Sequence, residues 1–577
     1  MKQLPLLRTG IFFSLTVIFV LILAVTACNN LGEDSHGDSD VTASKTASFS
    51  YTAAEVPSVG GGAQENANGG FRNIFELSED TLSVIVSGDI AGHELFLVKT
   101  NPTDTVIDSS RARYVVSVND ESTAAGESDA RMVKSHKRIF DEDITTHFDP
   151  PQEFDPNEAV PEAARAASFS VQTVTPTEFA CGDTREIFVD ANEAISTFEK
   201  QTATLLAIGK KCYVWVVDVP SNRAAEIYAA EVAETFDKLY SSVTTVYGNE
   251  SDTLYVFNGS NFTLADMACY SMTGTRVNIV LSRFVSVGTV GYFYCKDYYT
   301  GYTAKASDAR ASSNSGKYLY INTRYMGTER SRSMVYSTLA HEFQHLIMFG
   351  QKNIRCGVSA ANWFNEMMSM ICEDLLQDEL GIANAQSPKN RLGRFAASYY
   401  LSGAAEFISV DGSYLPSYAA LYGFGAYLIR TYGGAAFVNR IMQSDYCNEQ
   451  AIAKAVSAVT GREMTFSEIV QLYALSFVSN GMLSMNQPPE GSPFFEEFRD
   501  EATDYRYPLD PINMTDYLQK GSAGDYGMKL FLPEERVALR PNGFSLHSLG
   551  TATDDVMTIM FSETGAAGLK LFLIVAD

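Results

Sequence analysis

Two histidines of this chain lie four residues apart, with a glutamate directly after the first. The stretch His341-Glu342-Phe343-Gln344-His345 is an H-E-x-x-H motif in a chain that contains only seven histidines. Residues at i and i+4 share one face of a helix, so both imidazoles can reach a single zinc ion. Glu342 lies beside them, where it can act as general base on a zinc-bound water. The motif predicts a zinc hydrolase; the alternative is a polar helix face with two solvated histidines.

An amphipathic helix is expected around the motif. Its apolar residues recur at helical spacing, at Val335, Leu339, Phe343, Leu346 and Ile347. Ser331 and Ser333 are candidates for its N-cap, and Gly350 is expected to end it. Such a wide apolar face indicates a helix that is packed into the core rather than one that only decorates the surface.

A catalytic zinc site needs a third protein ligand, and the sequence indicates a carboxylate. The next histidine after the motif is the distant His547. The segment 362–376 is predicted to form a second helix, in which Glu366 stands among apolar residues where a solvated charge is not expected. Zinc would supply the partner that this carboxylate needs, although Glu366 could instead cap the N-terminus of its own helix.

Glu373 follows on the same predicted helix, two turns after Glu366 and on the same face. From there its carboxylate could accept a hydrogen bond from a ligand histidine and so orient the imidazole. The alternative is an ordinary solvated charge, and the sequence does not decide between the two.

With Trp363-Phe364-Asn365-Glu366 following the H-E-x-x-H motif, the chain resembles the gluzincin metallopeptidases. Within them it is most similar to the hyicolysin-like zinc endopeptidases, peptidase family M30, over about residues 178–485. Softer matches lie upstream, at Cys212-Tyr213-Val214-Trp215-Val216, Gly291-Tyr292-Phe293 and Tyr318-Leu319-Tyr320-Ile321-Asn322. The chain departs from the pattern at Met367, where many gluzincins have glycine.

The resemblance implies the fold and the chemistry of this region. We expect an α+β catalytic domain with a strand-rich half, a helical half and the H-E-x-x-H helix at their junction. We expect Zn²⁺ as cofactor, held by His341, His345 and Glu366, and endopeptidase activity on protein or peptide substrates.

The resemblance also implies a hydrogen-bond donor for the oxyanion that develops during peptide hydrolysis. In gluzincins a histidine or tyrosine of the helical half supplies it, and no histidine occurs here between His345 and His547. The stretch 417–434 is similar to the gluzincin helix that ends in Y-L…G-G, which places Tyr418 at the catalytic position and Tyr422 as second choice. In a chain with 30 tyrosines, the alternative is that both only pack.

The N-terminus carries the pattern of an export signal. Lys2 and Arg8 precede an apolar run, 11–25, that is too short for a comfortable membrane span. Small residues then lead to Cys28, as in a bacterial lipobox, so Cys28 is predicted to be the lipidated N-terminus of a membrane-anchored envelope protein. The alternative is an ordinary secretory signal and a secreted protein.

Hydrophobic patterning divides the rest of the chain. Alternating apolar and polar residues predict β-structure near both ends, on either side of the catalytic region. The predicted divisions are a lipoprotein signal peptide (1–27), a tether (28–45), a β-domain (46–118), a linker (119–175), a zinc metallopeptidase domain (176–490) and a C-terminal β-module (500–577).

The charge narrows the set of partners. With 43 basic and 69 acidic residues the net charge is −26, which argues against binding nucleic acid or an anionic lipid surface. Taken with the H-E-x-x-H motif, the family resemblance and the export signal, the leading hypothesis is a zinc endopeptidase of the cell envelope. Its oligomeric state is unknown. The alternatives are a lipoprotein binding module or adhesin on an inactive peptidase fold, and a zinc hydrolase that does not cleave peptides.

Overall fold

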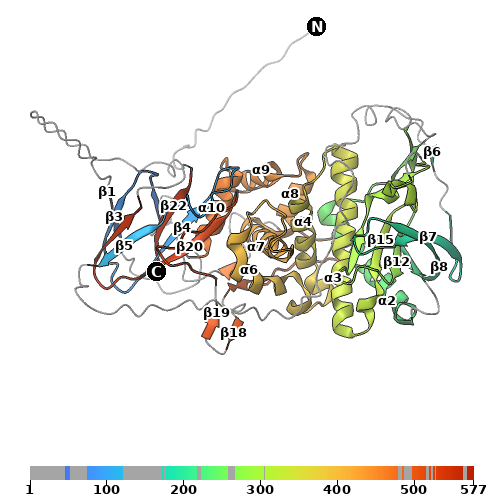
Figure 1. Ribbon diagram of the computed structural model, residues 1–577. Coiled ribbons are helices and arrows are strands. Elements are labelled where there is room, and N and C mark those ends of the chain that lie inside the picture. The colour runs from blue at the N-terminus through green and yellow to red at the C-terminus, as the bar shows by residue number, and fades with distance from the viewer. Residues whose placement is uncertain are drawn as a thin grey trace, which may run out of the picture.

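The computed structural model places strands at both ends of the described chain and helices in between (Figure 1). It describes residues 46–51, 74–120, 172–173, 177–217, 223–257, 267–303, 306–478, 484–485, 497–514, 519–521, 524–526, 528–562 and 568–576. The predicted signal peptide, the tether, the lipidation site Cys28 and most of the predicted linker lie outside the described residues. The arrangement is α+β, as expected.

A six-stranded mixed sheet forms one half of the catalytic region, in the order β13-β15-β12-β9-β8-β7. Its strands are β7 (Thr184–Asp190), β8 (Phe198–Ile208), β9 (Cys212–Val217), β12 (Val277–Ser282), β13 (Gly291–Phe293) and β15 (Tyr318–Asn322). The three central strands β9, β12 and β15 are parallel and consist largely of buried β-branched, leucine and aromatic residues. β13 joins antiparallel to β15 and forms one end of the sheet.

A smaller sheet lies beside the first, in the order β14-β10-β11-β6. Its strands are β6 (Gln172–Thr173), β10 (Thr253–Phe257), β11 (Met267–Ser271) and β14 (Tyr299–Thr300). Two short antiparallel pairs follow the helical half, β16 (Ser484–Met485) with β17 (Ile512–Asn513) and β18 (Gln519–Gly521) with β19 (Gly524–Tyr526). None of the three residues of the candidate metal group belongs to these strands.

Two long helices pack against the six-stranded sheet: α2 (Arg223–Tyr247) against β8 and β9, and α3 (Glu329–Met348) against β13 and β15. α3 carries the H-E-x-x-H motif, and Figure 1 shows it at the junction between the sheet and the helical half. Gly291 permits the close approach of α3 to β13, because a Cβ at this position would lie 2.7 Å from Cγ2 of Thr338.

The ends of α3 differ from the sequence prediction. The N-cap is Thr328, not Ser331 or Ser333, and Ser331 completes a capping box from the third helical position. Gly350 does not end the helix, which continues as a π-helical segment from Phe349 to Cys356 and stops at Gly357 with φ 63°. Gly350 is instead a close-packing position, since a Cβ there would meet the backbone of Ser251 at 2.7 Å.

The helical half follows the motif helix and packs α4 between α3 and α7 (Figure 1). Its α-helices are α4 (Asn362–Leu375), α5 (Gln377–Leu380), α6 (Leu392–Ser398), α7 (Leu415–Tyr432), α8 (Gly434–Gln443), α9 (Glu449–Thr460) and α10 (Phe466–Ser476). A buried ion pair joins two of them, because Arg430 of α7 donates to both carboxylate oxygens of Asp374 at 2.6 and 3.1 Å. Gly425 of α7 gives room for Ile371 and Met367 of α4.

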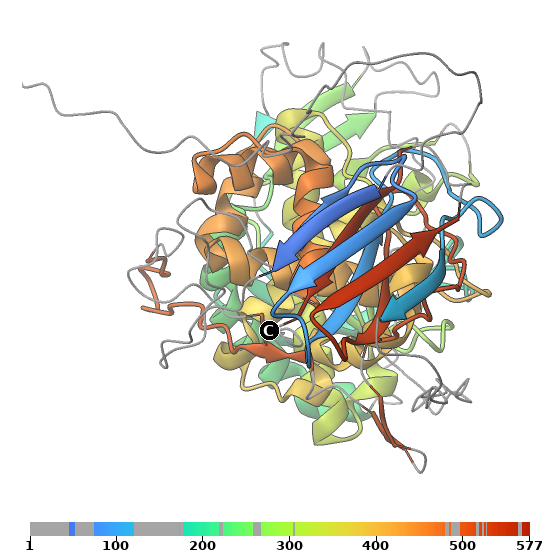
Figure 2. The ribbon, with the colours of Figure 1, turned by 90° about the vertical axis from the view of Figure 1, so that its left-hand side faces the viewer.

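The two ends of the described chain form one β-structure rather than separate N-terminal and C-terminal modules. One sheet has the order β1-β3-β21-β5 and the other β2-β22-β4-β20, so each sheet contains strands from both ends, and in the second sheet they alternate (Figure 2). The strands are β1 (Thr46–Tyr51), β2 (Ile74–Leu77), β3 (Ser83–Gly88), β4 (Glu94–Thr100), β5 (Val115–Asp120), β20 (Phe544–Thr551), β21 (Val556–Phe561) and β22 (Lys570–Val575). Hydropathy patterns identify such strands but carry no information on pairing over so long a separation.

The second of these sheets is buried on both faces. Leu97 and Leu573 belong to the core between the two terminal sheets, whereas Val98 and Phe572 belong to the main core of the catalytic region. Phe544 of β20 stacks on Phe477, which directly follows α10, with ring centroids 5.6 Å apart. The terminal strands thus pack onto the helical half. Among the described helices, none is long and apolar enough to cross a membrane.

Candidate metal centre

The two motif histidines emerge from the buried middle of α3. His341 and His345 have exposed fractions of 0 and 2%, and their ring centroids are 4.6 Å apart. α3 positions them because its helical turn places i and i+4 on one face. Phe343, on another face of α3, packs against Phe236 and Tyr240 of α2 and so fixes the rotation of the helix about its axis.

Glu366 of α4 completes a three-residue group with these histidines. Its Oε2 lies 3.3 Å from Nε2 of His341, and its Oε1 lies 4.0 Å from Nε2 of His345. One ligand atom from each of the three residues falls within 4.8 Å of the others, and all three side chains are buried. The structure therefore brings together the three residues that the sequence predicts as metal ligands.

The donor set and spacing of this group fit a tetrahedral metal ion. Two ligand atoms that each lie about 2.0–2.1 Å from a tetrahedral zinc are about 3.4 Å apart. The separations of 3.3 and 4.0 Å to Glu366 are close to that value. Two imidazoles and one carboxylate leave the fourth position to water or substrate, as in catalytic zinc sites. A buried carboxylate also needs a compensating positive charge, which a metal ion supplies.

Glu342 lies beside the group with its carboxyl in a water-poor setting. Burial raises the pKa of Glu342 to about 8, with the negative charge of Glu366 adding to the effect and His341 opposing it. The backbone N–H of Phe293 in β13 hydrogen-bonds to this carboxyl and favours its ionised form. A carboxyl with a pKa near neutrality is suited to take up and release a proton.

The other ring nitrogen of His341 is held by Glu373. Oε1 of Glu373 lies 2.9 Å from Nδ1 of His341, and Oε2 accepts a hydrogen bond from Ser337 of α3. Burial acts to lower the pKa of His341, but the carboxylates of Glu366 and Glu373 outweigh it and raise the pKa to about 10. With Nδ1–H donated to Glu373, Nε2 is the nitrogen directed at Glu366.

The ring of His345 is held by the hydroxyl of Ser369, which is paired with the amide of Gln344. The sequence analysis did not identify this pair. Ser369 of α4 lies 3.0 Å from Nδ1 of His345 and donates to Oε1 of Gln344, and both side chains are fully buried. The only sequence signal is that Ser369 stands one turn after Glu366 on an otherwise apolar stretch. Its contact to α3 depends on how the two helices pack, which spacing alone does not give.

The predicted tyrosines lie further along the helical half. Tyr418 is buried, edge-on to the ring of Phe407, with the guanidinium of Arg391 5.4 Å from its ring centre. The hydroxyl of Tyr422 donates to Asp374 at 3.0 Å, two turns beyond Glu366 on α4. These contacts do not include the metal group, so the role of Tyr418 stays a prediction.

Comparison with known proteins bears on this geometry. The family model described as peptidase M30 matches residues 192–516, more than half of the chain. The chain belongs to the peptidase M30 family. The match includes five strands of the six-stranded sheet, all except β7, together with α3, α4 and the rest of the helical half, so the M30 region contains every residue of the candidate metal centre.

One curated relative is a neutral metalloprotease, ShpI, from Staphylococcus hyicus. The two chains are 26% identical over 302 residues, which is 49% of this chain and 60% of the relative. The chain thus matches less than two thirds of the relative's length. The family and this relative support a metallopeptidase, and the buried group of two histidines and a glutamate in the M30 region could hold a metal ion.

Proposed function

We propose that this protein is a zinc-dependent endopeptidase in which Glu342 is the general base. The observation that carries the proposal is the buried group of His341, His345 and Glu366 with the carboxyl of Glu342 beside it. Zinc in this group would act as a Lewis acid and lower the pKa of a bound water to near neutrality. The intact set weighs against an adhesin built on an inactive peptidase fold.

The residues around the group have separate tasks in this proposal. Glu342 accepts the proton of the attacking water and returns it to the leaving amine, and a metal ion held beside it would favour the ionised carboxylate that a base needs. Glu373 and Ser369 hold the two imidazoles in the orientation that directs Nε2 at the metal. Tyr418 is proposed to stabilise the oxyanion.

The edge of the sheet supports a polypeptide substrate. β13 forms the end of the six-stranded sheet and, in the part of the chain that the structure describes, pairs only with β15. An unpaired strand edge can bind an extended peptide through its backbone groups. Phe293 of this strand also lines a small cavity of about 10 Å³ with His345 and Asn365, which is about the room that one water needs.

The decisive experiment measures hydrolysis and metal content together. Full-length protein should contain about one zinc per chain by that stoichiometry. It should also cleave casein or a peptide library, and lose this activity with a chelator. Glu342→Gln should keep the zinc but lower kcat by roughly 10³-fold, because the amide cannot accept the proton. Glu366→Ala should lose the zinc.

Two outcomes would contradict the proposal. Wild-type turnover in Glu342→Gln would remove Glu342 as the base. Stoichiometric zinc without hydrolysis of any peptide would favour a binding module or a zinc hydrolase of another substrate class.

A further inference from the structure

A second candidate site lies on the six-stranded sheet, away from the metal centre. A cavity of about 200 Å³ opens at the amino ends of β9, β12 and β15. Tyr213, Asn278 and Tyr318 line it from three neighbouring strands and are register partners across the sheet. Because they stand in one row, the side chains form a continuous wall.

This wall is on the face of the sheet that points away from α3. In β13, Gly291 meets Thr338 of α3, whereas the next residue, Tyr292, stacks on Tyr320 with ring centroids 4.5 Å apart. Successive residues of a strand point to opposite faces, so Tyr320 faces away from α3. Tyr318, two residues earlier in β15, shares the face of Tyr320. The cavity is therefore not a part of the metal centre.

The charge of the cavity lining is opposite to that of the chain. Three basic side chains line it, from Arg185, Arg276 and Lys317, with Glu178 as the single acidic one, in a protein of net charge −26. A concave site lined by cations is unusual in an acidic protein, and its positive electrostatic potential attracts anions.

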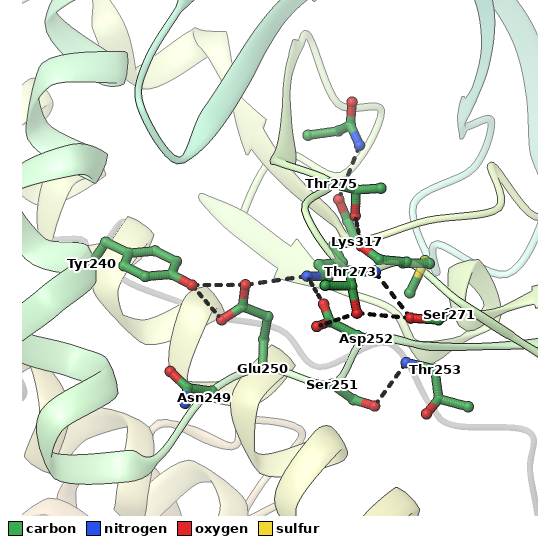
Figure 3. A network of polar contacts seen from close by, with 12 residues as sticks. Tyr240, Asn249, Glu250, Ser251, Asp252, Thr253, Ser271, Thr273, Thr275 and Lys317 are labelled. Atoms are coloured by element: carbon green, nitrogen blue, oxygen red, sulfur yellow. Dashed lines mark hydrogen bonds and ion pairs between the residues drawn. The ribbon is translucent and has the colours of Figure 1, made fainter. Parts of the chain in front are cut away.

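Two of the three cations already have carboxylate partners. Arg276 donates to Glu178 at 3.1 Å and to the hydroxyl of Tyr213 at 2.8 Å. The amino group of Lys317 lies between Glu250 and Asp252, at 3.2 and 2.6 Å, as Figure 3 shows. Their charges are largely compensated inside the protein.

Arg185 differs from both. Its guanidinium carbon lies 5.4–5.8 Å from the ring centres of Trp215, Phe179 and Tyr318. Among the residues that the structure describes, no carboxylate lies within salt-bridge distance of it. A side-chain hydrogen bond joins the guanidinium to Tyr318. A guanidinium has five N–H donors in a planar fork, so donors remain for a coplanar acceptor, for which a carboxylate is the matching partner. Gly316, where a Cβ would lie 3.0 Å from Cε2 of Tyr318, keeps space open nearby.

We propose that this cavity is a binding site for a carboxylate, held in a bidentate pair by Arg185 against the wall of aromatic rings. The carboxylate belongs either to a small free acid or to an acidic side chain of a polypeptide, and both present the same group to Arg185. The inference does not depend on the peptidase activity, because the cavity and the metal centre share no residue.

Tryptophan emission offers a direct test. The chain has two tryptophans, of which Trp215 packs beneath Arg185 and Trp363 belongs to α4. In the Trp363→Phe variant, emission from Trp215 should change saturably with glutarate at constant ionic strength, and not with the uncharged glutaramide. Adding Arg185→Gln should weaken glutarate binding at least tenfold, and Arg185→Lys should weaken it less, because a lysine keeps the charge but not the planar fork.

Arg283→Gln is the matched control, since it removes an exposed positive charge after the carboxyl end of β12 and should bind glutarate as its parent does. Calorimetric titration of the wild-type chain and of Arg185→Gln repeats the comparison without the tryptophan change. Binding of acetyl-Ala-Glu-Ala-amide by the Glu342→Gln chain would identify an acidic side chain as a source, and binding of glutarate alone a small free acid. Equal responses to glutarate and glutaramide, or undiminished binding by Arg185→Gln, would overturn the proposal.

Discussion

The two metal-site imidazoles are oriented by chemically different partners. His341 faces a carboxylate, Glu373, whereas His345 faces the neutral pair of Ser369 and Gln344. A carboxylate makes its histidine a more basic ligand than a hydroxyl does. Local spacing was sufficient to predict His341, Glu342 and His345, since all three lie on one helix. Ser369 was not predictable, because its contact with His345 joins two helices whose packing the sequence does not state.

Removing the hydroxyl partner should loosen the metal without unfolding the protein. Ser369→Ala leaves Nδ1 of His345 without this partner, and we expect zinc affinity to fall about 10- to 100-fold. Competition with a chromophoric chelator measures this directly. Ser333→Ala, at a half-buried position on the first turns of α3, serves as the control and should bind zinc normally. Equal affinity of both variants would show that Ser369 only fills space.

Substitution of Tyr418 and of Tyr422 distinguishes a catalytic tyrosine hydroxyl from a structural one. If Tyr418 supplies the oxyanion donor, Tyr418→Phe lowers kcat about a hundredfold or more, with little change in KM or zinc content. Tyr422→Phe should keep its turnover, because this hydroxyl is bonded to Asp374. It should instead lower the free energy of unfolding by about 1 kcal/mol. A slow Tyr422→Phe with a normal Tyr418→Phe would move the assignment by one helical turn.

At the scale of elements, the sequence located both α3 and α4, and it gave the bounds of α4 within one residue but not those of α3. The apolar stripe of α3 is fixed by a 3.6-residue repeat, which any buried helix must show. Its start at Thr328 depends on a single side-chain contact with Ser331, and several serines nearby offered the same signal. Its end depends on a π-helical turn that no hydropathy pattern encodes.

The terminal strands enclose a histidine that must stay neutral. His547 of β20 is fully buried, with Nδ1 3.0 Å from the carbonyl of Leu532 and Nε2 3.0 Å from the hydroxyl of Ser545. Burial lowers the pKa of His547 to about 3, and the positive charge of Lys99 adds to the effect. These contacts suit a neutral imidazole that donates to Leu532 and accepts from Ser545.

Acid should therefore destabilise the terminal β-structure. The folded-state pKa of His547 lies below the unfolded value of 6.5, so its stabilisation is fully present above pH 6.5 and is lost toward pH 3. Between pH 7 and pH 5 this amounts to a loss of about 2 kcal/mol. Urea unfolding at the two pH values measures it. His547→Asn should be less stable at pH 7 but should lose about 2 kcal/mol less on acidification; an unchanged pH dependence would exclude His547 as the cause.

At the scale of the whole molecule, the sequence predicted β-structure at both ends but not that strands of the two ends pair with each other. Alternating patterns predicted β-structure within 46–118 and 500–577, whereas β21 pairs with β3 and β5 across the full length of the catalytic region. Pairing at such separations depends on the fold of everything between, so it cannot be read from local patterns. The resemblance to the M30 family, in contrast, could be recognised mainly from two short motifs, which lie on α3 and α4.

The proposed lipid anchor is a property of the whole chain and is tested on it. If Cys28 is lipidated, the protein should fractionate with membranes, and Cys28→Ser should be released or remain unprocessed. Mass spectrometry of the purified N-terminus identifies the lipid. A mature N-terminus at another residue, without lipid, would contradict the anchor and favour the alternative of a secreted protein.

The union of the terminal strands also sets an order of events for a newly made chain. β3 and β5 are synthesised long before β21, and they can pair with it only after β21 has emerged. Until then these strands have unpaired edges, which are prone to associate with other chains. The M30 region between them is free to fold during this interval. Closure of the ends is therefore a late step of folding, and a chain cut short before β21 would expose the edges that this strand should cover and would lack Phe572 of the main core.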